Sequence, residues 1–284
     1  MKCRIFQVDA FTTERFSGNP AGVVFPADGL NDQQMVLLAR ELGNSETAFI
    51  MNDLQTVRYF TASQEVPLCT HATVASYHIM TTLLGLPCGK HTMQCKAGAL
   101  SIQVEERSGH PLIAVRQNAA TFGLCLSEHQ MGLLEHALGI SVGNAHFPVQ
   151  WVSTGNPKIL VPIENRKLLS SLKPDRSALI ELGVRLGCPG FYCFTLDDTQ
   201  EGVDAHARMF SPGSGIDEDP VTGNAAGALA VYLKRYGEHN RSTAVVIRQQ
   251  DHAGRFGYIN VQLDGEVPTI TGSAVLVYEG YMDW

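Results

Sequence analysis

Two short segments place residues that can move protons immediately before long runs of apolar residues. Residues 65–75 read EVPLCTHATVA and contain Cys69 and His71, and residues 218–228 read EDPVTGNAAGA and contain Asp219. Thiol, imidazole and carboxylate groups are side chains that act as general acids and bases in enzymes. Residues 72–84 and 225–233 are apolar or small on almost every side of a helix, so each segment is predicted to begin a buried helix.

The start of such a helix is a natural site for an anion. Its first N–H groups have no partner within the helix, and the helix dipole places about half a positive charge there. We therefore expect backbone N–H groups at both helix starts to bind the carboxylate of a small acid. The candidate substrate-binding residues are Asn19, Thr70, Ala72, Gly223 and Asn224.

Each proton-moving residue also has a structural interpretation. His71 can be a packed histidine, and Asp219 can be a helix cap. A further acid, Glu46 in the segment GNSETAF, has no acidic counterpart in the second half of the chain and can be a solvated residue on a strand. Cys69 raises the question of a racemase in which two thiols face each other. The residue equivalent to Cys69 in the second segment is Thr222, so the second thiol is missing and only a single-thiol mechanism stays open.

The two segments belong to an internal repeat. They share the frame Glu-x-Pro-[Leu/Val]-x-x-[His/Asn]-Ala-x-x-Ala, and Arg58-Tyr-Phe and Arg208-Met-Phe precede them. Ser17-Gly-Asn-Pro and Thr154-Gly-Asn-Pro match in the same order along the chain. These matches predict a tandem duplication of one α+β unit, with an N-terminal lobe at 1–118 and a C-terminal lobe at 119–284.

The elements of each half follow from apolar spacing and from capping residues. Helical spacing predicts helices over 32–42 and 175–186, each ended by glycine, and Ser127-x-x-Gln130 predicts a further helix ending at Gly139. Alternating residues predict strands over 101–104, 244–248 and 274–278. The buried helices are expected to lie inside curved sheets or between layers. Packing about a twofold axis would place both helix starts at one cleft.

Composition limits the classes of partner. The 284 residues include 44% hydrophobic and 17% charged residues, as in a globular protein, and carry a formal charge of −7 without a basic cluster. We expect no nucleic-acid partner and no membrane span. Seven cysteines without a Cys-x-x-Cys pair or a signal peptide predict reduced thiols and a cytoplasmic location.

Cofactor and metal motifs are not found in the sequence. Gly213-Ser-Gly215 lacks the third glycine of a dinucleotide site, and no Gly-x-x-x-x-Gly-Lys-[Ser/Thr] segment occurs. No histidine pair has the spacing of zinc ligands together with an acidic partner. We therefore expect neither a cofactor nor a metal.

Several motifs together resemble the phenazine biosynthesis-like (PhzF-like) family. They are VDAFTTERFSGNPAGVVF, NSETAF, RYFTASQEVPLCTHAT, ARMFSPGSGIDEDPVTGNAAG and the closing GRFG, in order along nearly the whole chain. The resemblance implies the diaminopimelate-epimerase fold, an α+β fold with two pseudo-symmetric lobes. Each lobe is a barrel-like mixed or antiparallel sheet around a central helix, the active site lies between them, and the last strand is able to cross back. It also implies a homodimer.

The resemblance further implies a reaction and assigns residues to it. The characterised reaction is a cofactor-independent proton shift on a dihydro-hydroxyanthranilate-type acid, and the family's glutamate, histidine and aspartate fall on Glu46, His71 and Asp219. Thr70 stands where the family usually has glycine, and Asn224 stands where it has serine. Both changes lie where substrate is expected to bind. They argue against phenazine chemistry itself and affect the proton-shifting residues less.

We therefore expect a cofactor-independent isomerase that acts on a small carboxylic acid through Glu46, His71 and Asp219. Two alternatives remain open. One is a racemase or dehydratase that uses the single thiol of Cys69, and the other is a small-acid-binding protein without turnover.

Overall fold

The computed structural model describes residues 2–142, 146–197, 202–237 and 243–283. The chain forms two units, of which the first comprises Met1–Arg116 with Thr271–Trp284 and the second comprises Gln117–Ile270. The predicted lobes were 1–118 and 119–284, with a last strand able to cross back. Residues 271–284 lie in the first unit because their strand pairs with the first strand of the chain.

The first unit has a six-stranded sheet in the order β18-β1-β2-β3-β4-β5. Its strands are β1 (Lys2–Ala10), β2 (Asn19–Phe25), β3 (Thr47–Ile50), β4 (Val57–Phe60), β5 (Glu65–Val66) and β18 (Ala274–Asp283). Neighbours are antiparallel except β2 and β3, which are parallel. A parallel pair needs a crossover, and helix α1 (Asp32–Leu42) supplies it between β2 and β3.

Capping residues fix the ends of α1 as the sequence predicts. Asn31 and Gln34 form a capping box at its start, and Gly43 ends it in the left-handed region with φ 69°. The apolar side chains Met35 and Leu38 are buried in a cluster with Phe49 and Phe60 of the sheet. Burial of one helix face against the sheet therefore positions β3, whose preceding residue is Glu46.

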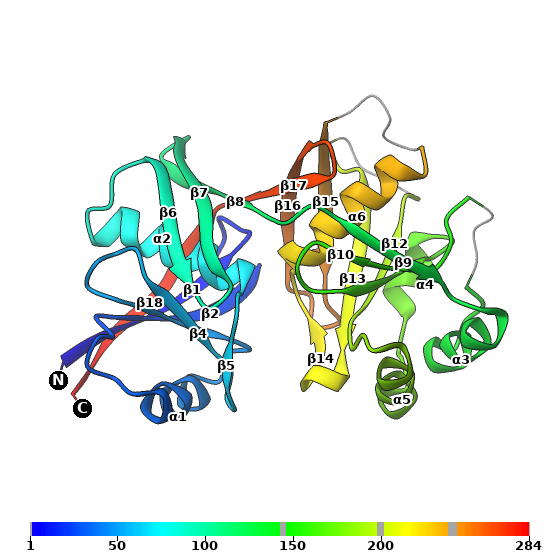
Figure 1. The fold of residues 1–284 in the computed structure, drawn as a ribbon, viewed down its shortest axis with the longest axis horizontal. Coiled ribbons are helices and arrows are strands. Elements are labelled where there is room, and N and C mark those ends of the chain that lie inside the picture. The colour runs from blue at the N-terminus through cyan, green and yellow to red at the C-terminus, as the bar shows by residue number, and fades with distance from the viewer. Residues whose placement is uncertain (1, 143–145, 198–201, 238–242, 284) are drawn as a thin grey trace. The chain divides into compact units, whose positions relative to one another are not determined.

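Helix α2 (Thr70–Leu83) is enclosed by strands of the first unit (Figure 1). It packs against β1, β2, β3, β18 and β8 (His110–Arg116). Antiparallel pairing joins β8 to β7 (Gly98–Arg107) and β7 to β6 (Gly89–Cys95). Every residue of α2 from Thr70 to Met80 is buried, which confirms the buried helix that the sequence predicts.

The second unit repeats this arrangement of strands. The pair β10–β11 is antiparallel, β11–β12 is parallel, and β12–β13 and β13–β14 are antiparallel. The successive pairs from β1 to β5 have the same directions. The strand order is β17-β16-β15-β13-β12-β11-β10-β9, with β14 beside β13. The strands are β9 (Thr121–Cys125), β10 (Gln150–Ser153), β11 (Lys158–Pro162), β12 (Phe191–Thr195), β13 (Ala205–Ser211), β14 (Ile216–Asp219), β15 (Ala244–Gln250), β16 (Phe256–Asp264) and β17 (Val267–Gly272).

The helices of the second unit include the other predicted buried helix. They are α3 (Glu128–Leu138), α4 (Arg166–Ser171), α5 (Arg176–Leu186), α6 (Gly223–Arg235) and the short 3-10 helix η1 (Pro212–Ser214). Helix α6 is buried from Ala225 to Leu233 and packs against β10, β11 and β16. These elements confirm the mixed α+β class. Among the described residues, no helix is both long and apolar enough to cross a membrane.

A buried histidine on α2 makes stability depend on pH. Burial, with a smaller contribution from His110, lowers the pKa of His78 from 6.5 to about 4. The unfolded chain therefore binds a proton at higher pH than the folded chain does. The contribution of His78 to the free energy of unfolding is fully present above pH 6.5. It is lost as the pH drops toward 4, which lowers the free energy of unfolding by on the order of 3 kcal/mol.

We predict that His78→Leu removes most of this component. The free energy of unfolding, measured by urea titration between pH 7 and 4, should then fall less steeply than in the original chain. His129, an exposed histidine on α3, is the matched control, and His129→Leu should keep the original slope. An unchanged slope in His78→Leu would contradict the assignment.

A glycine shapes the turn that leads into β2. Gly18 has φ 62°, and a Cβ there would lie 2.2 Å from the carbonyl oxygen of Ala10. Gly43 has a similar φ of 69° but open space around the missing Cβ. Substitution of each glycine by alanine therefore distinguishes two contributions to the loss of unfolding free energy. Both positions have a left-handed backbone, and only Gly18 adds a steric clash with the backbone.

We predict that Gly43→Ala costs roughly 1–2 kcal/mol of unfolding free energy, the ordinary cost of a left-handed alanine. Gly18→Ala should cost clearly more than about 2 kcal/mol, because the chain must also move away from the added methyl group. Urea unfolding of both variants measures the difference. Equal losses would show that the turn adapts freely.

Candidate active site

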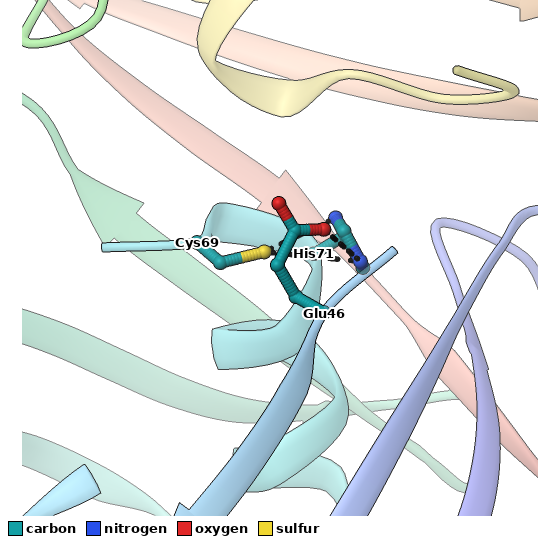
Figure 2. A group of neighbouring side chains, drawn as sticks. All are labelled: Glu46, Cys69 and His71. Atoms are coloured by element: carbon teal, nitrogen blue, oxygen red, sulfur yellow. Dashed lines mark hydrogen bonds and ion pairs between the residues drawn. The ribbon is translucent and has the colours of Figure 1, made fainter. Parts of the chain in front are cut away.

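Glu46, Cys69 and His71 form one cluster in the first unit (Figure 2). Their nearest donor atoms all lie within 4.8 Å of one another. The His71 Nε2 atom is 3.6 Å from Glu46 Oε2. The Cys69 sulfur lies 3.3 Å from Nδ1 and 3.8 Å from Nε2 of the same ring. The imidazole therefore contacts both an acid and a thiol.

Three local features position this cluster. Glu46 immediately precedes the fully buried strand β3, and Cys69 is the residue before the first turn of α2. Thr73 donates to the Cys69 carbonyl oxygen from its backbone N–H at 2.9 Å and from its hydroxyl at 2.7 Å. The Thr73 hydroxyl is also 2.7 Å from the Tyr59 hydroxyl of β4. The helix start is thus bound to the sheet.

The side chains of the cluster are largely shielded from water. The His71 side chain is 8% exposed and the Glu46 side chain is 18% exposed. Charges interact more strongly in such surroundings than at a surface, because less water screens them. Proton transfer between an acid and a base is favoured where both are held in contact.

The starts of α2 and α6 differ from the starts of the other α-helices. Side chains of Asn31, Ser127, Asn165 and Asp175 cap α1, α3, α4 and α5. Within the described residues, the N-cap side chains of α2 and α6, Cys69 and Thr222, make no such cap hydrogen bond. In these two buried helices the N-cap side chain therefore does not bind the first backbone N–H groups of the helix.

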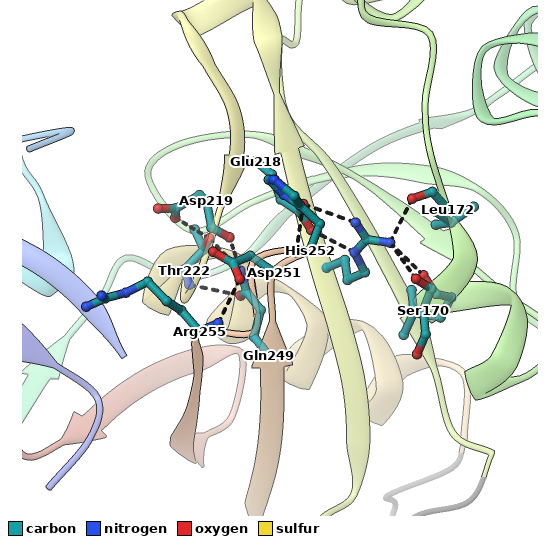
Figure 3. A network of polar contacts seen from close by, with 11 residues as sticks. Ser170, Leu172, Glu218, Asp219, Thr222, Gln249, Asp251, His252 and Arg255 are labelled. Carbon is teal, nitrogen blue, oxygen red and sulfur yellow. Dashed lines mark hydrogen bonds and ion pairs between the residues drawn. The ribbon is translucent and has the colours of Figure 1, made fainter. Parts of the chain in front are cut away.

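Asp219 lies at the end of β14 in the second unit and takes part in a polar network with Thr222 and Gln249 (Figure 3). The Thr222 hydroxyl donates to the Asp219 carboxylate. The amide of Gln249, a fully buried residue, donates to the Asp219 carbonyl oxygen at 2.7 Å and to Thr222 Oγ1 at 3.2 Å. Gln249 Oε1 accepts from the Thr222 N–H at 2.9 Å. This glutamine ties the residue before α6 to β15.

The sequence analysis did not identify Gln249. It lies in an alternating strand segment whose pattern predicts only an inward-facing position, and a buried glutamine there resembles any other core residue. Only the pairing of strands places it beside Asp219 and Thr222. The short hydroxyl–carboxylate contact fixes the Asp219 carboxyl group relative to the start of α6.

The predicted substrate-binding residues are divided between the two units. Asn19 and Ala72 are almost or fully buried, and Thr70 is 7% exposed. In the second unit, Asn224 donates from Nδ2 to Thr154 Oγ1 at 3.0 Å, while Gly223 is the first residue of α6. The structure therefore brings Glu46 and His71 together and gives Asp219 its own network. The joint action of all these residues on one substrate stays a prediction.

An arginine–glutamate pair braces the hairpin before each buried helix. In the first unit Arg58 Nε donates to Glu65 at 2.8 Å, and this bond lowers the pKa of Glu65. In the second unit Arg208 binds Glu218 through Nε at 2.7 Å and through Nη2 at 3.0 Å. These are the glutamates that the sequence repeat retains in both halves. They hold the hairpins that lead to Cys69 and Asp219.

The fold is mixed α+β, and its first unit holds an acid–thiol–imidazole cluster that suits proton transfer. Comparison with known proteins places such a chain among the isomerases. The chain belongs to the phenazine biosynthesis-like protein family, whose model matches residues 8–280. It is 36% identical to YddE of Escherichia coli K12, named an uncharacterized isomerase, over 100% of this chain and 99% of that protein.

Two further similarities extend this result. The chain is 30% identical to the trans-2,3-dihydro-3-hydroxyanthranilate isomerase of Pseudomonas chlororaphis, over 93% of this chain and 91% of that protein. It matches the crystal structure of the Bacillus anthracis phenazine biosynthesis protein of the PhzF family with a TM-score of 0.91 and 29% identity, over 100% of both chains. Both the family and the fold therefore extend along nearly the whole chain.

The two ion pairs differ in burial, and this difference gives a test of their roles. The Arg208 and Glu218 side chains are 6% and 5% exposed, whereas Arg58 and Glu65 are 26% and 16% exposed. We predict that Glu218→Gln costs about 3–5 kcal/mol, because it leaves a buried guanidinium without its carboxylate. Glu65→Gln should cost about 1 kcal/mol. Urea unfolding provides the comparison, and equal losses would contradict it.

Proposed function

We propose that this protein is a cofactor-independent isomerase that transfers a proton on a small carboxylic acid. The observation that carries the proposal is the contact between Glu46 and His71 at the start of a buried helix. A carboxylate and an imidazole in contact can take a proton from one atom and deliver it to another. The names of the curated relatives support the same class of reaction.

In this mechanism Glu46 is the base that removes a proton from carbon. Loss of that proton leaves negative charge on the substrate, spread toward its carboxylate as in an enolate. His71, at 3.6 Å from Glu46, relays the proton and holds the polar group of the substrate. Backbone N–H groups at the start of α2 then stabilise the charge, since fixed donors cost no reorganisation during the reaction.

Asp219 and the start of α6 complete the proposal. The Asp219 carboxylate, held by Thr222, would bind a polar group of the substrate and assist the proton relay. Gly223 and Asn224 would add backbone donors for the carboxylate. We further propose that the two units are duplicated barrel-like lobes, in keeping with their repeated strand directions, and that the protein is a homodimer.

The substrate is proposed only as a class. The relative from Pseudomonas chlororaphis is named for trans-2,3-dihydro-3-hydroxyanthranilate, and an unsaturated or hydroxylated acid of similar size is the natural starting point. Thr70 places a side chain at the first position of α2. A side chain there narrows the approach of a carboxylate to the backbone, so we expect a substrate other than this compound.

A second candidate function rests on the thiol. Cys69 lies 3.3 Å from Nδ1 of His71, and imidazole activates a neighbouring thiol as a base or nucleophile. A racemase or dehydratase that uses one thiol would therefore use the same helix start. The two candidates differ in which side chain takes the proton.

We predict that Glu46→Gln loses solvent deuterium incorporation by at least about 100-fold, because the amide cannot accept the proton. The assay is a panel of small unsaturated or hydroxylated carboxylic acids in deuterated water, followed by proton NMR. Cys69→Ala should keep exchange within about 10-fold. Exchange that survives in Glu46→Gln and disappears in Cys69→Ala would assign the reaction to the thiol.

A protein that binds the acid without turnover would differ from both enzyme candidates in this assay. Acids that bind to the protein, as measured by calorimetry, with no deuterium uptake for any acid of the panel in the unmodified chain would favour binding without turnover. Thermal unfolding of each variant is the control for folding, since a loss of exchange counts only where the variant melts as the original chain does.

A further inference from the structure

Three different donor atoms converge at the start of α2 without a dedicated metal motif in the sequence. They are a carboxylate oxygen of Glu46, the sulfur of Cys69 and a ring nitrogen of His71. Figure 2 shows the three side chains directed toward one another from the segment before β3 and from the first turn of the helix. Sulfur, imidazole nitrogen and carboxylate oxygen are the three ligand types that bind Zn²⁺ in proteins.

Two of the three donor–donor distances in this cluster are close to those around a tetrahedral ion. With Zn–N near 2.0–2.1 Å and Zn–S near 2.3 Å, tetrahedral angles separate nitrogen and sulfur ligands by roughly 3.5 Å, and nitrogen and oxygen ligands by roughly 3.4 Å. Here His71 Nε2 is 3.8 Å from the Cys69 sulfur and 3.6 Å from Glu46 Oε2. The Cys69 sulfur and the Glu46 carboxylate oxygen lie within 4.8 Å of each other, so movement of these two side chains toward each other would bring all three donors to one ion.

We propose that Glu46, Cys69 and His71 form a zinc-binding site with the fourth position open to water. Metal binding is argued from these three side chains alone and does not depend on the proposed reaction. Its consequence for catalysis rests on the proposed function, because a bound ion would occupy the carboxylate and the imidazole that transfer the proton. Zinc would then be a reversible inhibitor of the isomerase.

The charge of the donor set favours a divalent ion. Binding converts the Cys69 thiol to a thiolate, and the released proton goes to the buffer. One thiolate and one carboxylate neutralise Zn²⁺, and the neutral imidazole adds no charge. A neutral site avoids the cost of an unpaired charge in surroundings where His71 is 8% exposed. Hard ions such as Mg²⁺ prefer oxygen ligands and are not expected here.

A metal site of this kind leaves no signal in the spacing of histidine pairs. This cluster contains one histidine, and Glu46 lies far from Cys69 along the chain, so spacing gives no signal. The Cys-x-His pair at 69–71 is local, but it is too short a motif to identify a site. Folding of β3 beside α2 supplies the third donor.

Cobalt is the probe, because Co²⁺ adopts the same geometry and has a visible spectrum. We predict that one equivalent of Co²⁺ binds to chelator-treated protein and produces a thiolate-to-cobalt charge-transfer band with intense four-coordinate bands. Cys69→Ser should abolish the charge-transfer band. Loss of an outer partner already weakens metal binding by roughly 10–100-fold, so Glu46→Gln and His71→Gln should weaken it by more than about 100-fold.

Cys95→Ser is the matched control. Cys95 is a partly exposed thiol of the same unit that donates to the Gly98 carbonyl oxygen. This variant should bind Co²⁺ with the original stoichiometry and spectrum. A charge-transfer band that survives in Cys69→Ser, or an absence of stoichiometric binding in the original chain, would overturn the site. Thermal unfolding shows that each variant is folded.

Inhibition is measured separately from binding. Zn²⁺ should suppress deuterium exchange in proportion to the occupied fraction, and a chelator should restore it. Zinc that binds without suppressing exchange would overturn the inhibitory role and leave the metal site in place. If no acid shows exchange, the proposed function fails while the cobalt titration still decides the site.

Discussion

The burial of α2 from Thr70 to Met80 is the constraint on which the rest of the first unit depends. A helix whose start is buried against strands cannot expose its first N–H groups and side chains freely to water. Residues from β3, β4 and the preceding loop must therefore meet the helix start. Tyr59 of β4 contacts Thr73 near the start of the helix, and Glu46, the residue before β3, contacts His71 at the same place. The packing that buries α2 thus also brings the carboxylate of Glu46 to the imidazole of His71.

The second unit shows which parts of this arrangement the repeat preserves. Strand directions and the arginine–glutamate brace occur in both units. The residues between the brace and the helix differ, since Cys69 is replaced by Thr222 and Val66 by Asp219. The scaffold has therefore been kept, and the groups that it presents have diverged. A separate network through Gln249 holds the second helix start.

Local pattern predicted most elements because capping residues and apolar spacing act over a few residues. The helix at 32–42 and the buried helices after Cys69 and Thr222 follow from such patterns. Such local patterns do not predict contacts between residues that are far apart in the sequence. Glu46 was assigned through family resemblance, and its contact with His71 depends on how β3 lies against α2. Gln249 and the three-donor cluster likewise arise only when distant segments pair.

The pairing of β1 with β18 has a consequence for synthesis on the ribosome. Residues 2–10 must wait for residues 274–283 before the six-stranded sheet of the first unit is complete. All residues of the second unit, which ends at Ile270, emerge earlier than this closing strand. Until then β1 is an open edge, and open edges attract other strands. Of the strands in this sheet, β1 therefore emerges first and gains its second neighbour last.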